Sequence, residues 1–329
     1  MTEAATHPFA ALTPDFLLAA VEAQGFVCDG RLAALNSYEN RVYQVGIEGG
    51  EPLIAKFYRP GRWSDAQITE EHEFCRELAE LELPVVPPLV DATGNTPWRS
   101  DGFRFALFPR RGGRAPDLDC PDTLLILGRT LGRIHGIGAV RPFVHREHLD
   151  SRSRGHDSVA LIAAQFIPDA LRAAYVSVTR DLLERIDAAF AAAADITRIR
   201  THGDCHPGNL LWRDGAPNFV DFDDAVMAPA VQDLWMLLSG ERAQAELQLA
   251  ELMAGYEEFY DFDPRELRLI EPLRALRIIH YAAWLARRVD DPAFIQAFSW
   301  FNTERYWGDH ILALREQLAA LAEPPLRLL

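Results

Sequence analysis

Three polar residues in the middle of the chain have a spacing that strongly constrains its fold. Asp204 lies in a loop after a β-prone run, Asn209 follows five residues later, and Asp221 comes twelve residues after that. The residues 210–221 have the pattern of a β-hairpin. Such a hairpin would fold the second carboxylate back against the loop, so that two carboxylates and one amide converge in a small volume. This predicts a site for a metal ion and for proton transfer.

Each of these residues also has an ordinary structural explanation. Asp204 could cap a turn, Asn209 could hold a left-handed loop position, and Asp221 could belong to a solvated acidic edge. The joint spacing favours a phosphotransfer site, because a lysine on a predicted strand and an acid-rich helix precede it in the chain.

That lysine, Lys56, is the single lysine of the chain, against 32 arginines. It excludes the P-loop NTPases, since their loop requires G-x-x-x-x-G-K-[ST] whereas Lys56 lies in Leu53-Ile-Ala-Lys-Phe57. A lysine supplies a compact ammonium that can contact phosphate oxygens without the rigid fork of arginine. A stray solvated cation remains the alternative explanation.

The composition indicates a globular chain that does not bind polyanions. Its 329 residues suffice for two lobes, and 48 acidic against 33 basic residues give a formal charge of −15. This charge argues against nucleic acid and anionic membranes as partners. No apolar run reaches the length of a membrane span, and the first residues lack a signal-peptide pattern. We therefore expect a cytoplasmic protein whose cysteines Cys28, Cys75, Cys120 and Cys205 are reduced thiols.

The pattern of apolar residues and turn signals predicts an α+β chain with two parts. Residues 1–108 are expected to form an N-terminal lobe and residues 109–329 a C-terminal lobe. The first lobe should contain helices over 13–24 and 64–80 and strands over 41–45, 53–57, 87–90 and 102–108. The second should contain a strand over 196–201 and helices over 122–138, 159–166, 169–194, 231–239, 246–260, 264–289 and 303–322.

A zinc site at the central loop is a weaker alternative. His202, Cys205 and His206 would crowd three ligands into five residues, with no distant Cys or His pair to complete a tetrahedron.

Longer motifs resemble a known superfamily. The loop His202-Gly-Asp-Cys-His-Pro-Gly-Asn209, followed by Phe219-Val-Asp-Phe-Asp-Asp-Ala225, resembles that of the aminoglycoside phosphotransferase and choline kinase superfamily. Segments 35–44, 56–60, 229–238, 269–275 and 291–294 resemble, within it, the bacterial stress response kinases, which are RdoA-type serine/threonine protein kinases. The resemblance extends from about residue 35 to residue 325.

The resemblance implies a two-lobed protein-kinase-like fold with a small antiparallel-sheet N-lobe and a mainly helical C-lobe. It implies ATP and Mg²⁺, transfer of the γ-phosphoryl group to protein serine or threonine, and a monomeric enzyme in stress response and cell survival. Asp204 matches the catalytic base, and Asn209 and the catalytic Asp221 match the magnesium ligands. Lys56 matches the phosphate-binding lysine. Further matched positions are Glu71 as the helix partner of Lys56, with Glu70 next, Ser37 in the nucleotide-covering loop, and Asp233 supporting the catalytic loop.

Two features depart from eukaryotic protein kinases. The nucleotide-covering loop, residues 36–42, has no glycine, so the Ser37 hydroxyl and nearby amides are expected to replace the bare backbone of a G-x-G-x-x-G loop. Only Val226-Met-Ala-Pro229 separates the acidic motif from the next predicted helix. Regulation by phosphorylation of an activation loop is therefore not expected.

Two other functions stay open on the sequence. One is a small-molecule kinase acting on a choline-, homoserine- or aminoglycoside-like alcohol, and the other is a catalytically silent nucleotide-binding scaffold. The helix 269–289 carries five arginines (Arg268 at its edge, Arg274, Arg277, Arg287 and Arg288) with Tyr281 and Trp284. This face favours an anionic or protein acceptor over a cationic alcohol, although ordinary solvation and packing would also account for it.

Overall fold

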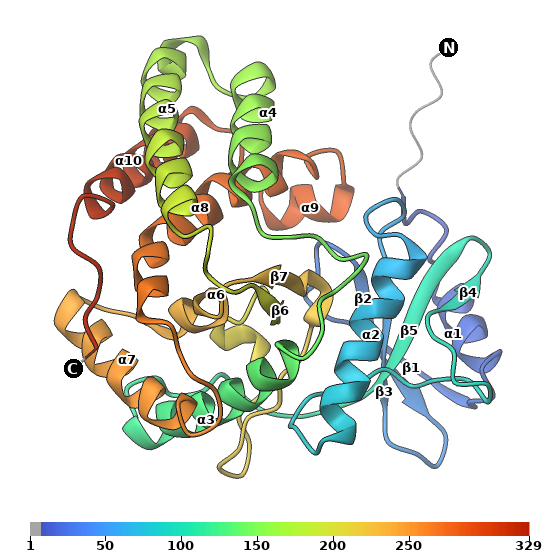
Figure 1. The fold of residues 1–329 in the computed structure, drawn as a ribbon. Coiled ribbons are helices and arrows are strands. Elements are labelled where there is room, and N and C mark those ends of the chain that lie inside the picture. The colour runs from blue at the N-terminus through green and yellow to red at the C-terminus, as the bar shows by residue number, and fades with distance from the viewer. Residues whose placement is uncertain (1–7, 329) are drawn as a thin grey trace. The chain divides into compact units, whose positions relative to one another are not determined.

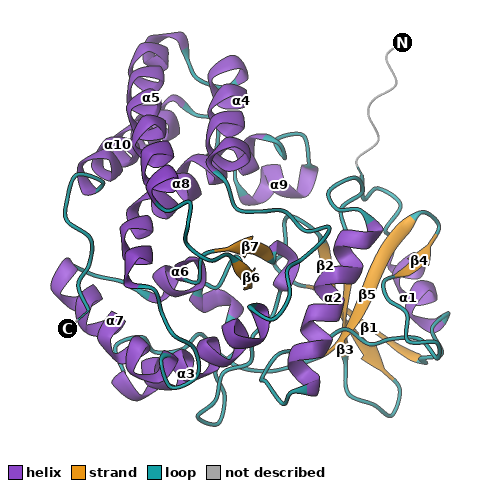
Figure 2. Ribbon diagram, viewed as in Figure 1, coloured by secondary structure: helices purple, strands orange, loops and turns teal. Residues whose placement is uncertain are grey.

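The structure, a computed structural model, describes residues 8–328 and divides into two compact units. Of the described residues, unit 1 contains 8–117, 143–146 and 206–225, and unit 2 contains 118–142, 147–205 and 226–328. Five of the strands lie together in one sheet, and the remainder is mainly helical with one small additional sheet (Figure 1, Figure 2). The predicted α+β class with a small antiparallel sheet is confirmed. The lobe boundary after residue 108 stays a prediction.

Unit 1 is built on a five-stranded antiparallel sheet in the order β1-β2-β3-β5-β4. The strands are β1 (Cys28–Ala34), β2 (Arg41–Ile47), β3 (Leu53–Phe57), β4 (Trp98–Ser100) and β5 (Phe103–Pro109). Lys56 lies on the middle strand, where it pairs with Val42 of β2 and Ala106 of β5. The single lysine is therefore held at the centre of the sheet by backbone ladders on both sides.

Two helices accompany this sheet, α1 (Pro14–Glu22) and α2 (Asp65–Glu80). Each begins with a side-chain cap. Thr13 accepts a hydrogen bond from the Phe16 N–H, and Ser64 and Gln67 form a reciprocal capping box at α2. The residue at which α2 begins is thus fixed by its own first turn.

Two strand predictions in unit 1 need correction. Residues 87–90 form no strand, because Pro87 and Pro88 have no N–H to donate, and only Leu89 donates to the Leu107 carbonyl, at 2.7 Å. Residues 210–221 do fold back on themselves, but as isolated bridges: Leu210 pairs with Phe219, and Leu211 and Asn218 exchange two 2.9 Å hydrogen bonds.

Unit 2 is mainly helical, with one two-stranded antiparallel sheet of β6 (Ile199–Thr201) and β7 (Val226–Ala228). Its α-helices are α3 (Pro121–Gly138), α4 (Asp157–Gln165), α5 (Asp169–Ala192), α6 (Val231–Leu234), α7 (Arg242–Tyr256), α8 (Ile270–Ala286), α9 (Pro292–Ala297) and α10 (Glu304–Ala320). Two predicted helices are divided: residues 235–237 after α6 and residues 264–269 before α8 are 3₁₀ turns. The short α9 was not predicted.

Among residues 8–328, no helix has both the length and the apolar character that crossing a membrane requires.

Candidate active site

Lys56 is buried in unit 1 and its ammonium lies between two carboxylates. Nζ is 2.8 Å from Asp221 Oδ1 and 3.1 Å from Asp223 Oδ1. Burial by itself disfavours the ammonium, but Asp221 and Asp223 outweigh it and raise the pKa of Lys56 well above its ordinary value. The structure therefore brings two of the predicted residues, Lys56 and Asp221, into direct contact and adds Asp223.

The two aspartates differ because of the backbone at Asp221. That residue has a left-handed conformation, with φ of 63°, just before the 3₁₀ turn Phe222–Asp224. The Asp221 side chain is 55% exposed, whereas that of Asp223 is 5% exposed. Between them, the buried Phe222 ring contacts Phe74 of α2 edge to face. Asp223 was not predicted, and only its alternation with Asp221 in Asp-Phe-Asp could have signalled it.

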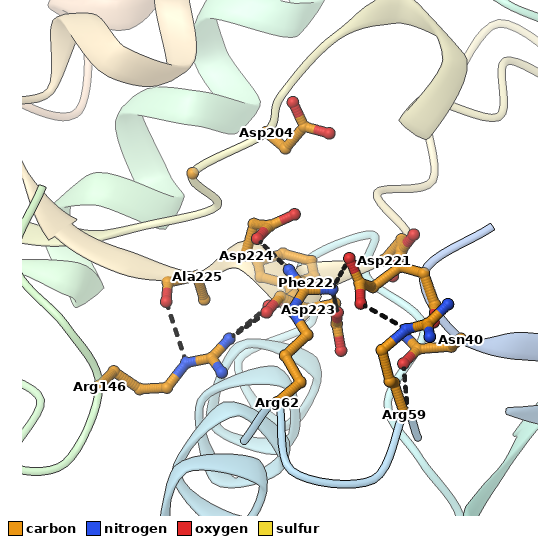
Figure 3. Close-up of polar contacts among 12 residues, drawn as sticks. Asn40, Arg59, Arg62, Arg146, Asp204, Asp221, Phe222, Asp223, Asp224 and Ala225 are labelled. Atoms are coloured by element: carbon orange, nitrogen blue, oxygen red, sulfur yellow. Dashed lines mark hydrogen bonds and ion pairs between the residues drawn. The ribbon is translucent and has the colours of Figure 1, made fainter. Parts of the chain in front are cut away.

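Arg146 fixes this turn from within unit 1 (Figure 3). Its guanidinium donates to the carbonyl oxygens of Phe222 at 3.2 Å, Asp223 at 2.6 Å and Ala225 at 2.9 Å. The buried Asp223 carboxylate would have a raised pKa from burial alone, but Lys56, Arg62 and Arg146 together hold the pKa well below its ordinary value. Asp223 is therefore a stable buried anion.

Asn209 reaches the same segment through the folded-back residues 210–220. It ends the 3₁₀ turn Pro207–Asn209, and its carbonyl accepts the Val220 N–H at 3.1 Å, which places it beside the residue that precedes Asp221. Amide and carboxylate oxygens are the hard ligands that Mg²⁺ prefers, so the chemistry of Asn209 and Asp221 fits a divalent cation that completes its shell with phosphates and water. No group of three His, Cys, Asp or Glu side chains in the described part of the chain could hold a metal alone.

The two adjacent glutamates of α2 have different surroundings. Glu70 accepts hydrogen bonds from the backbone N–H groups of Val144, His145 and Arg146. Glu71 is buried, and within residues 8–328 its Oε2 has no hydrogen-bond partner. Burial raises the pKa of Glu71 to about 7, against the opposing influence of Lys56. The charge of Lys56 thus limits this rise in the pKa of Glu71, but Lys56 forms its ion pairs with Asp221 and Asp223.

Ser37 lies in the loop that joins β1 to β2, and its nucleotide-covering role stays a prediction. Its Oγ donates to the Asn40 carbonyl at 3.3 Å. The hydroxyl is partly buried and is oriented by its own loop.

Residues 202–205, which begin the loop that carries Asp204, belong to unit 2, where Asp233 of α6 supports them. The fully buried Asp233 carboxylate accepts the His202 N–H at 2.7 Å and the Gly203 N–H at 2.8 Å, and it lies 3.1 Å from His135 Nε2. Gln232 donates to the Gly203 carbonyl at 2.7 Å. Gly203 has a φ of 83°, which glycine adopts without strain. The backbone leading to Asp204 is therefore fixed on both sides.

Asp204 is partly buried and forms an ion pair with Arg277 of α8, also within unit 2. Its N–H donates to His202 Nδ1 at 3.3 Å. The sequence distinguishes Arg277 from the neighbouring arginines by no feature, and the structure shows that it contacts Asp204, the proposed base.

Two of the three residues considered as zinc ligands, Cys205 and His206, have surroundings that do not suit zinc binding. Cys205 is buried, and burial raises the pKa of its thiol well above the ordinary value, against formation of the thiolate that zinc requires. His206 lies in unit 1, where its Nδ1 accepts the Gly208 N–H at 2.9 Å.

Comparison with known proteins identifies relatives over nearly the whole chain. The family described as "Phosphotransferase enzyme family" matches residues 31–270. Stress response kinase A of Escherichia coli (strain K12) is 45% identical over 321 residues, which is 97% of both chains. Serine/threonine protein kinase RdoA of Salmonella typhimurium is 44% identical over 326 residues, again 97% of both. The predicted resemblance is confirmed.

The fold is also similar to that of solved kinases. The amicoumacin kinase hAmiN, in complex with AMP-PNP, Ca²⁺ and Ami, has a TM-score of 0.71 and 18% identity, covering 94% of this chain and 93% of its own. At this identity the likeness concerns the fold, and it confirms the kinase-like architecture.

Proposed function

Since this chain belongs to the phosphotransferase enzyme family and is an ATP-dependent phosphotransferase, we propose that it phosphorylates serine or threonine hydroxyls of proteins with Mg²⁺ and ATP. The observation that carries the phosphotransfer assignment is the contact of the only lysine with Asp221 and Asp223, 2.8 and 3.1 Å away. The name of the RdoA relative supports a protein acceptor.

On the nucleotide side, Lys56 binds phosphate oxygens and the Ser37 hydroxyl holds the phosphates from the covering loop. Asn209 and Asp221 would hold Mg²⁺, which supplies positive charge against the phosphates when it is bound. Asp223 keeps Lys56 in place, and Glu71 adds negative charge beside the ammonium. These residues position the nucleotide without covalent chemistry, as suits a loose transition state.

On the acceptor side, Asp204 orients the acceptor hydroxyl and takes its proton. The hydroxyl oxygen forms a bond to the γ-phosphorus while the bond from that phosphorus to the oxygen of ADP breaks, so the products are phosphoprotein, ADP and a protonated Asp204. Asp233 holds the loop that carries the base.

The contact between Arg277 and Asp204 favours a protein over a cationic alcohol as acceptor. A guanidinium beside the base repels a choline- or aminoglycoside-like cation, whereas a polypeptide hydroxyl carries no charge. The names of the relatives support a role in stress response. Cytoplasmic location and a monomeric state belong to the same proposal.

One assay separates the proposed function from its alternatives. Purified protein is incubated with Mg²⁺ and γ-labelled ATP, alone, with a general protein acceptor, and with a panel of choline-, homoserine- and aminoglycoside-type alcohols. Label on the protein acceptor supports the proposal, label on an alcohol overturns the acceptor class, and no label with nucleotide bound indicates a silent scaffold. Asp204→Ala should abolish transfer while ATP binding stays measurable, and full activity in that variant would refute the role of Asp204.

A further inference from the structure

The nucleotide-covering loop is fastened by an arginine although it has no glycine. Arg59, in the turn after β3, donates from Nε to the Glu39 carbonyl at 2.9 Å and from a terminal nitrogen to the Tyr38 carbonyl at 3.0 Å. Its N–H donates to the buried Asn40 side chain at 3.1 Å (Figure 3). These contacts hold residues 38–40 of the loop in one conformation.

The same loop is also tied through the Glu39 carboxylate. Glu39 Oε1 lies 3.2 Å from Arg59, and Oε2 lies 3.2 Å from Arg62, three residues further along the turn. The Glu39 side chain is largely buried, so these ion pairs are less screened than those at the surface.

Arg62 is the residue that connects the loop to the acidic turn. Its two terminal nitrogens lie 2.7 Å from Asp223 and 2.6 Å from Asp224 (Figure 3), and its guanidinium stacks 5.0 Å from the centre of the Trp63 ring. Burial by itself would lower the pKa of Arg62, but Asp224 and Asp223 raise it, so the cation persists. Asp223 in turn contacts Lys56.

The ion pairs form an unbroken series from Glu39 through Arg62 and Asp223 to Lys56, all within unit 1. We propose that Arg62 is a positioning residue that couples the nucleotide-covering loop to the segment carrying Asp221, so that nucleotide and divalent cation bind cooperatively. The inference rests on the proposed function, because it takes the loop at Ser37 as the nucleotide side and Asp221 as the metal side.

The coupling follows from the shape of the arginine side chain. A planar guanidinium can hold three carboxylates at fixed angles, whereas lysine presents a single point charge. A cation bound at Asp221 restrains the turn that bears Asp223 and Asp224, and Arg62 passes that restraint to Glu39 and the loop. By linkage, the gain in nucleotide affinity from metal equals the gain in metal affinity from nucleotide.

The test measures binding of AMP-PNP by calorimetry with Mg²⁺ and with EDTA, for the full chain and its variants. In Arg62→Gln, we expect the Mg²⁺-dependent gain in nucleotide affinity to fall by about tenfold. Arg59→Gln is the matched control, since it loosens the loop without touching Asp223 or Asp224; it should weaken binding in both conditions and keep the gain. Arg62→Lys should recover only part of the gain. An undiminished gain in Arg62→Gln would overturn the proposal.

A second measurement needs neither nucleotide nor metal. Amide hydrogen exchange over residues 36–42 should quicken in Arg62→Gln and, more mildly, in Asp224→Asn, which removes only the outer, partly exposed partner and serves if Arg62→Gln does not fold. Unchanged exchange and an undiminished gain in Asp224→Asn would also count against the coupling. Failure of the wild-type chain to bind AMP-PNP would instead refute the nucleotide assignment, and the exchange data would still decide whether Arg62 orders the loop.

Discussion

Lys56 and Asp223 form an ion pair that is almost fully shielded from solvent. Nζ lies 3.1 Å from Oδ1, and the two side chains are 6% and 5% exposed. In protein kinases a strand lysine pairs with a helix glutamate, whereas here the α2 glutamate Glu71 is only an electrostatic neighbour of the Lys56 ammonium. Lys56 thus has a buried anchor, Asp223, in addition to the exposed Asp221.

We expect that arginine cannot replace Lys56 in this buried pair. Lys56→Arg keeps the charge, but a planar fork is larger than the space that the ammonium fills between Asp221 and Asp223, and it cannot act as a point charge toward phosphate. We expect kcat/KM to fall by about 100-fold or more. Steady-state kinetics with varied ATP measures this, and Arg180→Lys on the exposed face of α5 is the control. Activity within about threefold of wild type would show that charge alone suffices.

Asp233 should be needed for both stability and turnover. Its buried carboxylate accepts hydrogen bonds from the N–H groups of His202 and Gly203 and lies beside His135. In Asp233→Asn an NH₂ group replaces one carboxylate oxygen, so a hydrogen-bond donor would face a backbone N–H donor. We expect a loss of about 3–5 kcal/mol in the free energy of unfolding, measured in urea, and a fall in kcat with little change in nucleotide affinity. The exposed Asp290→Asn is the control. Equal stability of both variants would contradict the role of Asp233.

Features carried by contiguous residues were predictable from the sequence. The capping box at Ser64 and the β3 strand around Lys56 each follow from a local pattern, and the structure contains both. The predicted roles of Asp204, Asn209 and Ser37 stay predictions, although the structure places Asn209 beside the residue that precedes Asp221.

What the sequence could not supply depends on backbone handedness and on contacts between distant residues. The left-handed φ of Asp221 decides which aspartate faces inward, and no composition rule predicts that for a non-glycine residue. Arg62 meets Asp223 across 161 positions of the chain. Nothing in the sequence distinguishes Arg62 from the other 31 arginines as the residue that makes this contact.

His72 should make acid conditions selectively destabilising. Its buried ring lies between the Tyr58 hydroxyl at 2.6 Å and the Thr96 hydroxyl at 3.0 Å, and burial, aided by Lys56, lowers its pKa from 6.5 to about 3. Between these values the unfolded chain binds a proton that the folded chain does not. The free energy of unfolding therefore decreases as the pH is lowered from 6.5 towards 3, by about 1.4 kcal/mol per pH unit.

His72→Gln removes this contribution and isolates it. The variant should be less stable than wild type at pH 7, and the difference should shrink by about 1.4 kcal/mol for each pH unit below 6.5. Urea titrations at pH 7, 6 and 5 measure it. The comparison is made with wild type because Glu71, whose pKa is raised by burial, favours the folded state as pH falls through the same window. Parallel stability curves for the two proteins would contradict the prediction.

Backbone contact sets the spacing of α3 and α7 in unit 2. A Cβ added to Gly128 of α3 would overlap the Leu252 carbonyl oxygen, and one added to Gly255 of α7 would overlap the Leu125 carbonyl oxygen. Gly128→Ala must therefore push two helix backbones apart, and we expect it to lower the free energy of unfolding by about 1–3 kcal/mol or more.

Gly308→Ala in α10 is the matched control, because nothing lies within 4 Å of a Cβ added to Gly308. Alanine there should stabilise the protein by about 0.5–1 kcal/mol through helix propensity. Opposite shifts in Tm for the same chemical change would separate packing from propensity, and stabilisation by both would show that the two helices are free to move apart.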